Sequence, residues 1–276
     1  MMDWTTPFVF DFMQRAFAIS ILIAVPMALL SCFLVLRGWS LMGDAISHAV
    51  LPGIVLAYVA GIPLAIGAFL AGMFCAVSTG WLNLNSRLKE DTVMGIVFSG
   101  MFGLGIVLFA AVPSNLHLDH ILFGDMLGIG WRDIVWTGSV AVGITLALLL
   151  LRSDLMALIF DPAHAQAIGL KVRWLHYGLL AMISLSVVSA LTAIGIILAI
   201  GLLIAPGAIA FLWTRRFGAM LIIATVVSVV AAVAGVYLSF WLDSAPAPTI
   251  ILLLTAVFVF SFVVTVRRDR RARQAA

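Results

Sequence analysis

Long apolar runs recur from one end of the chain to the other, separated by short polar segments. A run of about 20 residues crosses a hydrocarbon core of about 30 Å as an α-helix. The runs are continuous and do not alternate at every second position, which favours helices over the strands of a transmembrane barrel. The predicted spans are 17–36, 45–60, 64–82, 93–112, 134–151, 175–191, 194–213, 220–240 and 249–266.

This pattern predicts an all-α polytopic membrane bundle of eight or nine spans that fills residues 1–276 as a single domain. Two predicted spans contain helix-breaking residues: Pro52 and Gly53 in the second, and Pro206 with Gly201 and Gly207 in the seventh. We therefore expect at least one broken or kinked helix. Around Pro206, the small residues favour close helix packing over gating.

Composition supports the membrane assignment. Hydrophobic residues make up 64% of the chain and charged residues 10%, against about 45–50% and about 25% in a soluble domain. The net charge of +3 does not indicate nucleic-acid binding, because the basic residues lie between spans and in the tail 267–276. The positive-inside rule places that tail, with segments 87–89, 152–173 and 215–216, in the cytoplasm. On this count the N-terminus faces outward, although a re-entrant segment among the predicted spans would reverse its side.

Three further features have simple interpretations. The leader 1–16 mixes aromatic and charged residues, as an interfacial helix does, although a frayed start to the first span fits equally well. The run 17–36 is too long for the core of a signal peptide and is expected to remain as a span. Cys32 and Cys75 both fall inside predicted spans and are interpreted as small buried hydrophobic residues.

Asp44 and His48 are the first candidate site. Side chains four residues apart project from the same face of a helix. An ionisable group inside a membrane is costly and usually lines a bundle interior or a wet cavity. Carboxylate oxygen and imidazole nitrogen bind Mn(II), Fe(II) and Zn(II). The spacing alone leaves a second interpretation open, in which Asp44 caps the helix and His48 is an interior histidine.

A family resemblance extends this site. VLRGWSLMGDAISHAVLPGIVLAY (35–58) resembles the signature of the ABC-3 family, the permease subunits of ABC importers for zinc, manganese and iron. Four further segments match that family in the same order: NSRLKEDTVMGIVFSGMFGLGIVLF, HILFGDMLGI, FDPAHAQAIGL and LTAIGIILAIGLLIAPGAIAFL. The resemblance implies that Asp44 and His48 lie in a metal translocation path. It is stronger to the manganese and iron chelate branch, with a zinc importer as the alternative.

The segment FDPAHAQAIGL lies in the predicted cytoplasmic loop 152–173. Asp161 and Pro162 are typical of a helix start and Gly169 of a helix stop, so a short capped helix is expected, with His164 on the surface. The family resemblance implies that this loop couples the permease to its ATPase. The residues it assigns to coupling are Asp161, Pro162, Ala165 and Gly169.

No GxxxxGK[ST] motif occurs in the chain, so we expect no ATP hydrolysis by this polypeptide. It is interpreted as a non-enzymatic permease of the bacterial inner membrane, with no permanently bound cofactor. The resemblance implies a second permease subunit, identical or homologous, two ATPase subunits that use ATP, and an external solute-binding protein. An ion-gradient-driven transporter is the second hypothesis, and an intramembrane metalloenzyme ranks last because HExxH is absent.

A second candidate set lies in the predicted outer loop. His117, Asp119 and His120 carry metal-ligand chemistry and would suit a relay site at the outer mouth. Solvated loop residues or a docking surface for the binding protein explain them equally well. The resemblance makes Asp125 a weaker candidate for lining the pathway.

Overall fold

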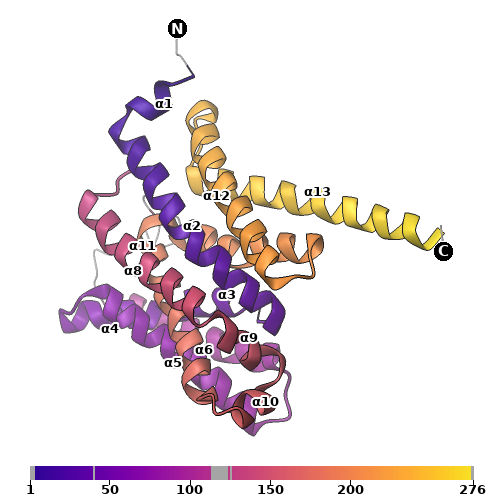
Figure 1. The fold of residues 1–276 in the computed structure, drawn as a ribbon. Coiled ribbons are helices and arrows are strands. Elements are labelled where there is room, and N and C mark those ends of the chain that lie inside the picture. Colours follow the sequence, from indigo (N-terminus) through magenta and orange to yellow (C-terminus); the bar gives the residue numbers. More distant parts are fainter. Residues whose placement is uncertain (1–3, 40, 113–123, 125, 275–276) are drawn as a thin grey trace.

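The computed structural model describes residues 4–39, 41–112, 124 and 126–274. Within these ranges all regular elements are helices (Figure 1). Their bounds are α1 Thr6–Val9, α2 Asp11–Arg37, α3 Met42–Ala49, α4 Leu51–Ala60, α5 Leu64–Asn85, α6 Glu90–Ala111, α8 Trp131–Leu150, α9 Arg152–Phe160, α10 Pro162–Ala167, α11 Val172–Trp213, α12 Phe217–Leu242 and α13 Pro246–Gln274.

Nine segments of the described chain are long and apolar enough to cross a membrane. Six helices supply one span each: α2, α5, α6, α8, α12 and α13. The pair α3 and α4 together supplies one span, and α11 supplies two. The predicted all-α bundle of eight or nine spans is therefore confirmed, and the short helices α9 and α10 fill the loop expected between the fifth and sixth spans.

The second span is divided, as its sequence predicts. α3 ends at Ala49 and α4 begins at Leu51, with Val50 between them in helical conformation. Pro52 has no N–H and cannot donate to the carbonyl of His48, four residues earlier. The helical ladder is therefore interrupted next to the candidate site, which explains why the span forms two short helices.

The break in α11 falls at Gly195, outside the region where proline suggested it. Gly195 has φ 77° and ψ 169°, a non-helical conformation that is almost exclusive to glycine. Pro206 is buried and stays inside the helical second half. The interpretation of the Pro206 region as close packing is confirmed, because a Cβ on Gly207 would lie 2.5 Å from the carbonyl oxygen of Ser31 on α2.

The packing core surrounds α2, which contacts α8, α11 and α12. Small residues allow these helices to approach closely, which is how membrane helices associate without a hydrophobic driving force between them. The hydroxyl of Ser228 on α12 donates to the carbonyl of Ala24 on α2 at 3.2 Å. Cys32 and Cys75 are both buried with free thiols, as interpreted from sequence.

Aromatic residues tie the start of the chain to the end of α12. The rings of Trp4 and Trp241 lie 6.1 Å apart, and those of Phe8 and Tyr237 lie 5.9 Å apart. The hydroxyl of Tyr237 also donates to the carbonyl of Trp4 at 3.2 Å. The leader therefore divides into the short α1, held by these rings, and residues 11–16, which form the first turns of α2.

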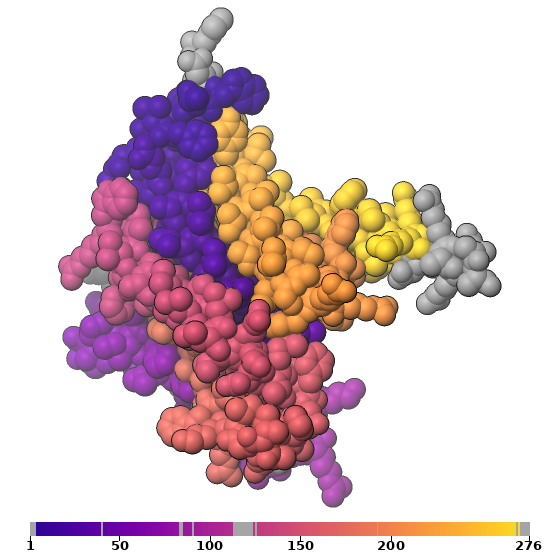
Figure 2. Space-filling model, viewed as in Figure 1, coloured from indigo at the N-terminus to yellow at the C-terminus, as the bar shows by residue number. Residues whose placement is uncertain are grey.

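α13 stands out from the rest of the molecule (Figures 1 and 2). Its early residues pack on α11 and α12, where a Cβ on Gly201 would lie 3.3 Å from Ile251 and one on Gly235 would lie 2.4 Å from Ile250. Farther along, Phe258, Phe260 and Phe262 are exposed. Such an apolar surface is stable in a membrane, where lipid or another membrane protein covers it.

Candidate functional site

Asp44 and His48 meet on one face of α3. The Nε2 atom of His48 lies 3.3 Å from Oδ1 of Asp44, so the predicted shared face is confirmed. The side chain of Asp44 keeps 34% of its surface exposed, and that of His48 keeps 29%. They are therefore close enough to bind one ion together and open enough to exchange it.

The imidazole of His48 lies against two aromatic rings of α6. The ring of Phe102 is 5.1 Å away edge to face, and that of Phe98 is 6.2 Å away at an interplanar angle of 29°. The Nδ1 atom of His48 is buried, and no described residue forms a hydrogen bond with it. The aromatic wall thus orients the ring and leaves Nε2 directed towards Asp44.

Glycines set the position of this divided span. A Cβ on Gly43 would lie 2.7 Å from Leu203, so α3 packs directly on the second half of α11. Gly53 and Gly67 bring α4 against α5 in the same way, because a side chain on either would strike the backbone of the other. The half-exposed face of Asp44 and His48 is costly against hydrocarbon and requires water or protein to cover it.

Two side chains are an incomplete ligand set for a divalent ion. Among the described residues, no third His, Cys, Asp or Glu joins Asp44 and His48 to form a metal-binding group. A resident zinc ion usually has three or four protein ligands. The arrangement is chemically suited to weak and temporary coordination, with water or other groups as the remaining ligands.

His117, Asp119, His120 and Asp125 lie outside the described residues. The adjacent Gly124 is described and has φ 69°. A Cβ on Gly124 would lie 2.4 Å from the backbone nitrogen of Gly195, so Gly124 itself rests directly on the break in α11.

The predicted short capped helix is confirmed as α10. The Oδ1 atom of Asp161 accepts a hydrogen bond from the N–H of His164 at 2.9 Å, and Pro162 occupies the first turn. Gly169 follows the helix with φ 86°. Ala165 is fully buried, whereas His164 is exposed as predicted. The helix is therefore anchored on one side and open on the other.

Sequence reasoning missed Arg37 and Trp39, which connect the end of α9, just before α10, with the start of α3. Nη1 of Arg37 contacts the carbonyl oxygen of Ile159 at 3.4 Å, and its guanidinium lies 5.2 Å from the ring centre of Trp39. Both residues are inside the matched motif, but no local pattern assigns them a role. Arg37 and Ile159 are far apart in sequence, so the contact becomes evident only in the fold.

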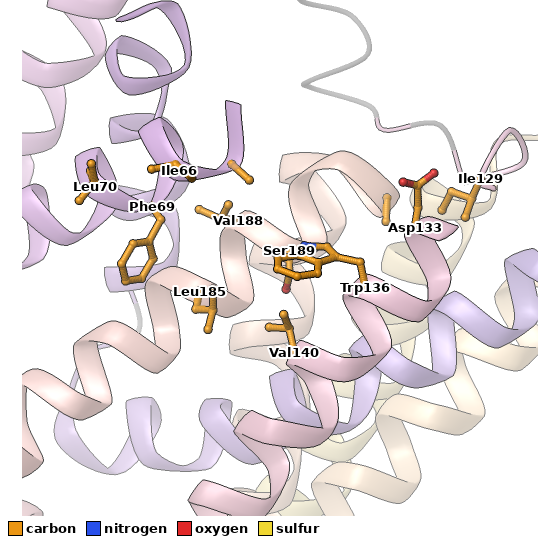
Figure 3. Close-up of a pocket in the computed structure, with 12 residues that line it drawn as sticks. Ile66, Phe69, Leu70, Ile129, Asp133, Trp136, Val140, Leu185, Val188 and Ser189 are labelled. Carbon is orange, nitrogen blue, oxygen red and sulfur yellow. The ribbon is translucent and has the colours of Figure 1, made fainter. Parts of the chain in front are cut away.

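A cavity of about 510 Å³ lies between α5, α8 and the first half of α11 (Figure 3). Asp133 lies at the end near Ile129, and the hydroxyl of Ser189 already donates to the carbonyl of Ser186 at 3.0 Å. Its mainly apolar lining does not form a cation site. The principal lining residues are Ile66, Phe69, Leu70, Trp136, Val140, Leu185 and Val188.

Residues 9–265 match the model of the ABC 3 transport family. The chain belongs to that family. The chelated iron transport system membrane protein YfeD of Yersinia pestis is similar to this ABC 3 chain, with 56% identity over 257 residues covering 93% of the chain and 86% of YfeD. The manganese transport system membrane protein MntB of Synechocystis sp. shares 48% identity over 258 residues, covering 93% of the chain and 84% of MntB.

The solved structure of PsaBC from Streptococcus pneumoniae in complex with Fab also resembles this ABC 3 chain. Its TM-score is 0.82 at 35% identity, with coverage of 92% of this chain and 91% of that chain. The family match runs from before α2 into α13 and therefore includes the divided span with Asp44 and His48. The chain is a multi-pass ABC 3 membrane permease, as its sequence motifs predicted.

Proposed function

We propose that this permease carries manganese(II) or iron(II) across the bacterial inner membrane as part of an ATP-driven importer. The observation that carries the proposal is the contact between Asp44 and His48 on a divided span of an ABC 3 permease. The relatives named for chelated iron and for manganese support these two ions over zinc. Zinc remains the alternative cargo, because the same two ligands also bind it.

Asp44 and His48 act as a temporary stopping point for the ion. The carboxylate supplies negative charge, and the imidazole supplies a neutral nitrogen ligand. A site with only these side chains prefers later metals of the Irving–Williams order over manganese, so an external solute-binding protein provides most of the selectivity. The binding protein then selects the ion, and the permease only passes it on. Weak coordination in the permease suits this role, because a tightly held ion would leave slowly.

The energy comes from partner subunits in this proposal. Two cytoplasmic ATPases hydrolyse ATP, and this chain pairs with a second permease subunit, identical or homologous. The open side of α10 contacts the ATPase, and its buried side, at Ala165, keeps it fixed to the permease. No cofactor is permanently bound. The capped helix on a basic loop favours this scheme over an ion-gradient-driven transporter.

His117, Asp119 and His120 complete the proposed route at its outer end. Their side chains could receive an ion from the binding protein before it reaches Asp44 and His48. Asp125 is a weaker candidate for lining the route. This part of the proposal rests on the sequence and the family resemblance.

Metal uptake in a bacterial strain lacking the chain tests the proposed function. Cells that express the wild-type chain should accumulate manganese or iron, measured by elemental analysis with each ion supplied separately. Asp44→Asn and His48→Gln should reduce uptake by about 10-fold or more, because the first removes the negative charge of the pair and the second its imidazole nitrogen. Asp133→Asn on α8 is the matched control and should keep normal uptake. Normal uptake in both site variants would contradict the proposal that Asp44 and His48 bind the ion during transport.

A further inference from the structure

We propose that Arg37 and Trp39 form a mechanical link between α10 and the Asp44–His48 pair. Through this link, movement of α10 at the ATPase changes the position of α3 and so the ligand geometry. The inference deepens the proposed function and rests on it. Neither residue contacts the ion in this scheme, so both are positioning residues.

The first contact joins Arg37 to the end of α9. Nη1 of Arg37 lies 3.4 Å from the carbonyl oxygen of Ile159. Carbonyls in the last turn of a helix lack helical partners and carry partial negative charge, so a cation is favourable there. Ile159 is two residues before Asp161, the cap of α10. Any displacement of α10 is therefore transmitted to the carbonyl that Arg37 holds.

The second contact joins Arg37 to Trp39. The guanidinium lies 5.2 Å from the ring centre, a cation–π distance. Gly38, with φ 80°, reverses the chain between them, and the N–H of Trp39 donates to the carbonyl of Leu34 at 2.8 Å. The indole is 3% exposed and packs edge to face on His176 of α11 at 5.4 Å. Trp39 is thus fixed between the end of α2 and the start of α11.

The third contact joins Trp39 to α3. The carbonyl of Trp39 accepts a hydrogen bond from the N–H of Met42, the first residue of α3, at 2.9 Å. Asp44 is two residues farther along, so it lies in the first turn that this bond anchors. The break after Ala49 separates α3 from α4. In the proposal, α3 shifts as a short rigid unit when Trp39 moves.

Coupling through packed side chains requires an element with two positions that both sites influence. In this proposal α3 is that element, because Trp39 holds its first turn and Pro52 interrupts the helical ladder just beyond its last turn. Its two ionisable side chains would change their distance from Phe98 and Phe102 of α6 as it shifts. Such a change would alter how well the pair holds an ion.

Transport stoichiometry tests the link in the complete importer, purified with its partner subunits and placed in proteoliposomes. Mn(II) taken up and ATP hydrolysed are measured in the same preparation. Arg37→Gln should keep ATP hydrolysis but lower Mn(II) transported per ATP by about fivefold or more, the lower end of typical coupling between sites. Arg37→Lys should restore part of the ratio, because it keeps the charge near the Ile159 carbonyl.

Arg152→Gln is the matched control, since Arg152 is exposed at the first residue of α9. It should keep the wild-type ratio. If Arg37→Gln does not insert, Trp39→Phe provides the test, because it keeps an aromatic ring in the buried site but reduces the cation–π surface. A wild-type ratio in an inserted variant of either residue would overturn the link.

Hydrogen exchange distinguishes a link from a general structural role. ATP binding should change amide exchange in both α10 and α3 of the wild-type importer. In Arg37→Gln, the change in α10 should persist and the change in α3 should fall. An unchanged α3 response would overturn the inference. If the wild-type importer shows ATP-driven uptake of neither Mn(II) nor Fe(II), the proposed function itself fails, which is a separate result.

Discussion

Gly53 and Gly67 lie back to back where α4 crosses α5. A Cβ on Gly53 would be 2.1 Å from the carbonyl oxygen of Gly67, and a Cβ on Gly67 would be 2.2 Å from the carbonyl oxygen of Gly53. Neither helix can therefore accept even a methyl group at this crossing without moving its backbone. Because α4 continues the span that carries Asp44 and His48, this crossing fixes the half of the span that follows the candidate site.

Gly53→Ala should destabilise the permease by about 1–3 kcal/mol, the usual cost of overpacking. Thermal unfolding in detergent measures the effect. Gly95→Ala on α6 is the matched control, because its Cβ would meet nothing within 4 Å. Helix propensity alone predicts a gain of up to about 1 kcal/mol there. Equal melting temperatures for the two variants would contradict the packing argument.

Gly195→Ala should also lower the unfolding temperature. The conformation at φ 77° and ψ 169° costs a residue with a side chain about 1–3 kcal/mol. Gly124→Ala should act in the same direction, because its Cβ would collide with the backbone of Gly195. Gly103→Ala, on an open face of α6, provides the comparison. The expectation fails if Gly195→Ala unfolds no earlier than Gly103→Ala.

Asp161→Ala should loosen α10 by about 1 kcal/mol, the typical cost of losing an N-cap side chain. The amide of His164 loses its acceptor, so its hydrogen exchange should accelerate by about 5-fold. Asp161→Asn should preserve protection, because asparagine caps helices about as well as aspartate. Equally rapid exchange in both variants would show that the cap does not hold α10.

Gly169→Trp should leave membrane insertion intact and abolish association with the ATPase. The residue is exposed just after α10 with φ 86°, so a large side chain there both strains the turn and obstructs the open side of the helix. Co-purification of the ATPase with the tagged permease is the measurement. Gly218→Trp, exposed at the start of α12, should keep the ATPase bound. Retained association in Gly169→Trp would contradict the coupling assignment.

The spans, the caps of α10 and the shared face of Asp44 and His48 were predictable from sequence because each depends on local chemistry. Apolar run length determines a span, and Asp161, Pro162 and Gly169 act within a few residues of one another. The family resemblance added a role for these positions. It did not reveal how the positions are connected in space.

The boundary between the two spans of α11 was predicted between 191 and 194, but the non-helical conformation of Gly195 and the contacts of Arg37 depend on distant residues and were therefore missed. Pro206 is a stronger local signal than Gly195, but membrane helices tolerate proline where neighbouring helices surround it. Gly195 takes its non-helical conformation against Gly124, which precedes it by a long stretch of chain. In the same way, the carbonyl of Ile159 becomes a partner of Arg37 only after α2 and α9 have packed together.

The two spans of α11 follow each other without a polar loop, and this affects how the chain inserts into the membrane during synthesis. Residues 192–196 read TAIGI and contain no charged group. When this pair of segments enters the lipid together, no charge has to be moved across the bilayer at their junction, which avoids a cost of about 2.5 kcal/mol or more per ionised side chain. A charged substitution at Ile194 should therefore impair delivery of the chain to the membrane before it affects any transport step.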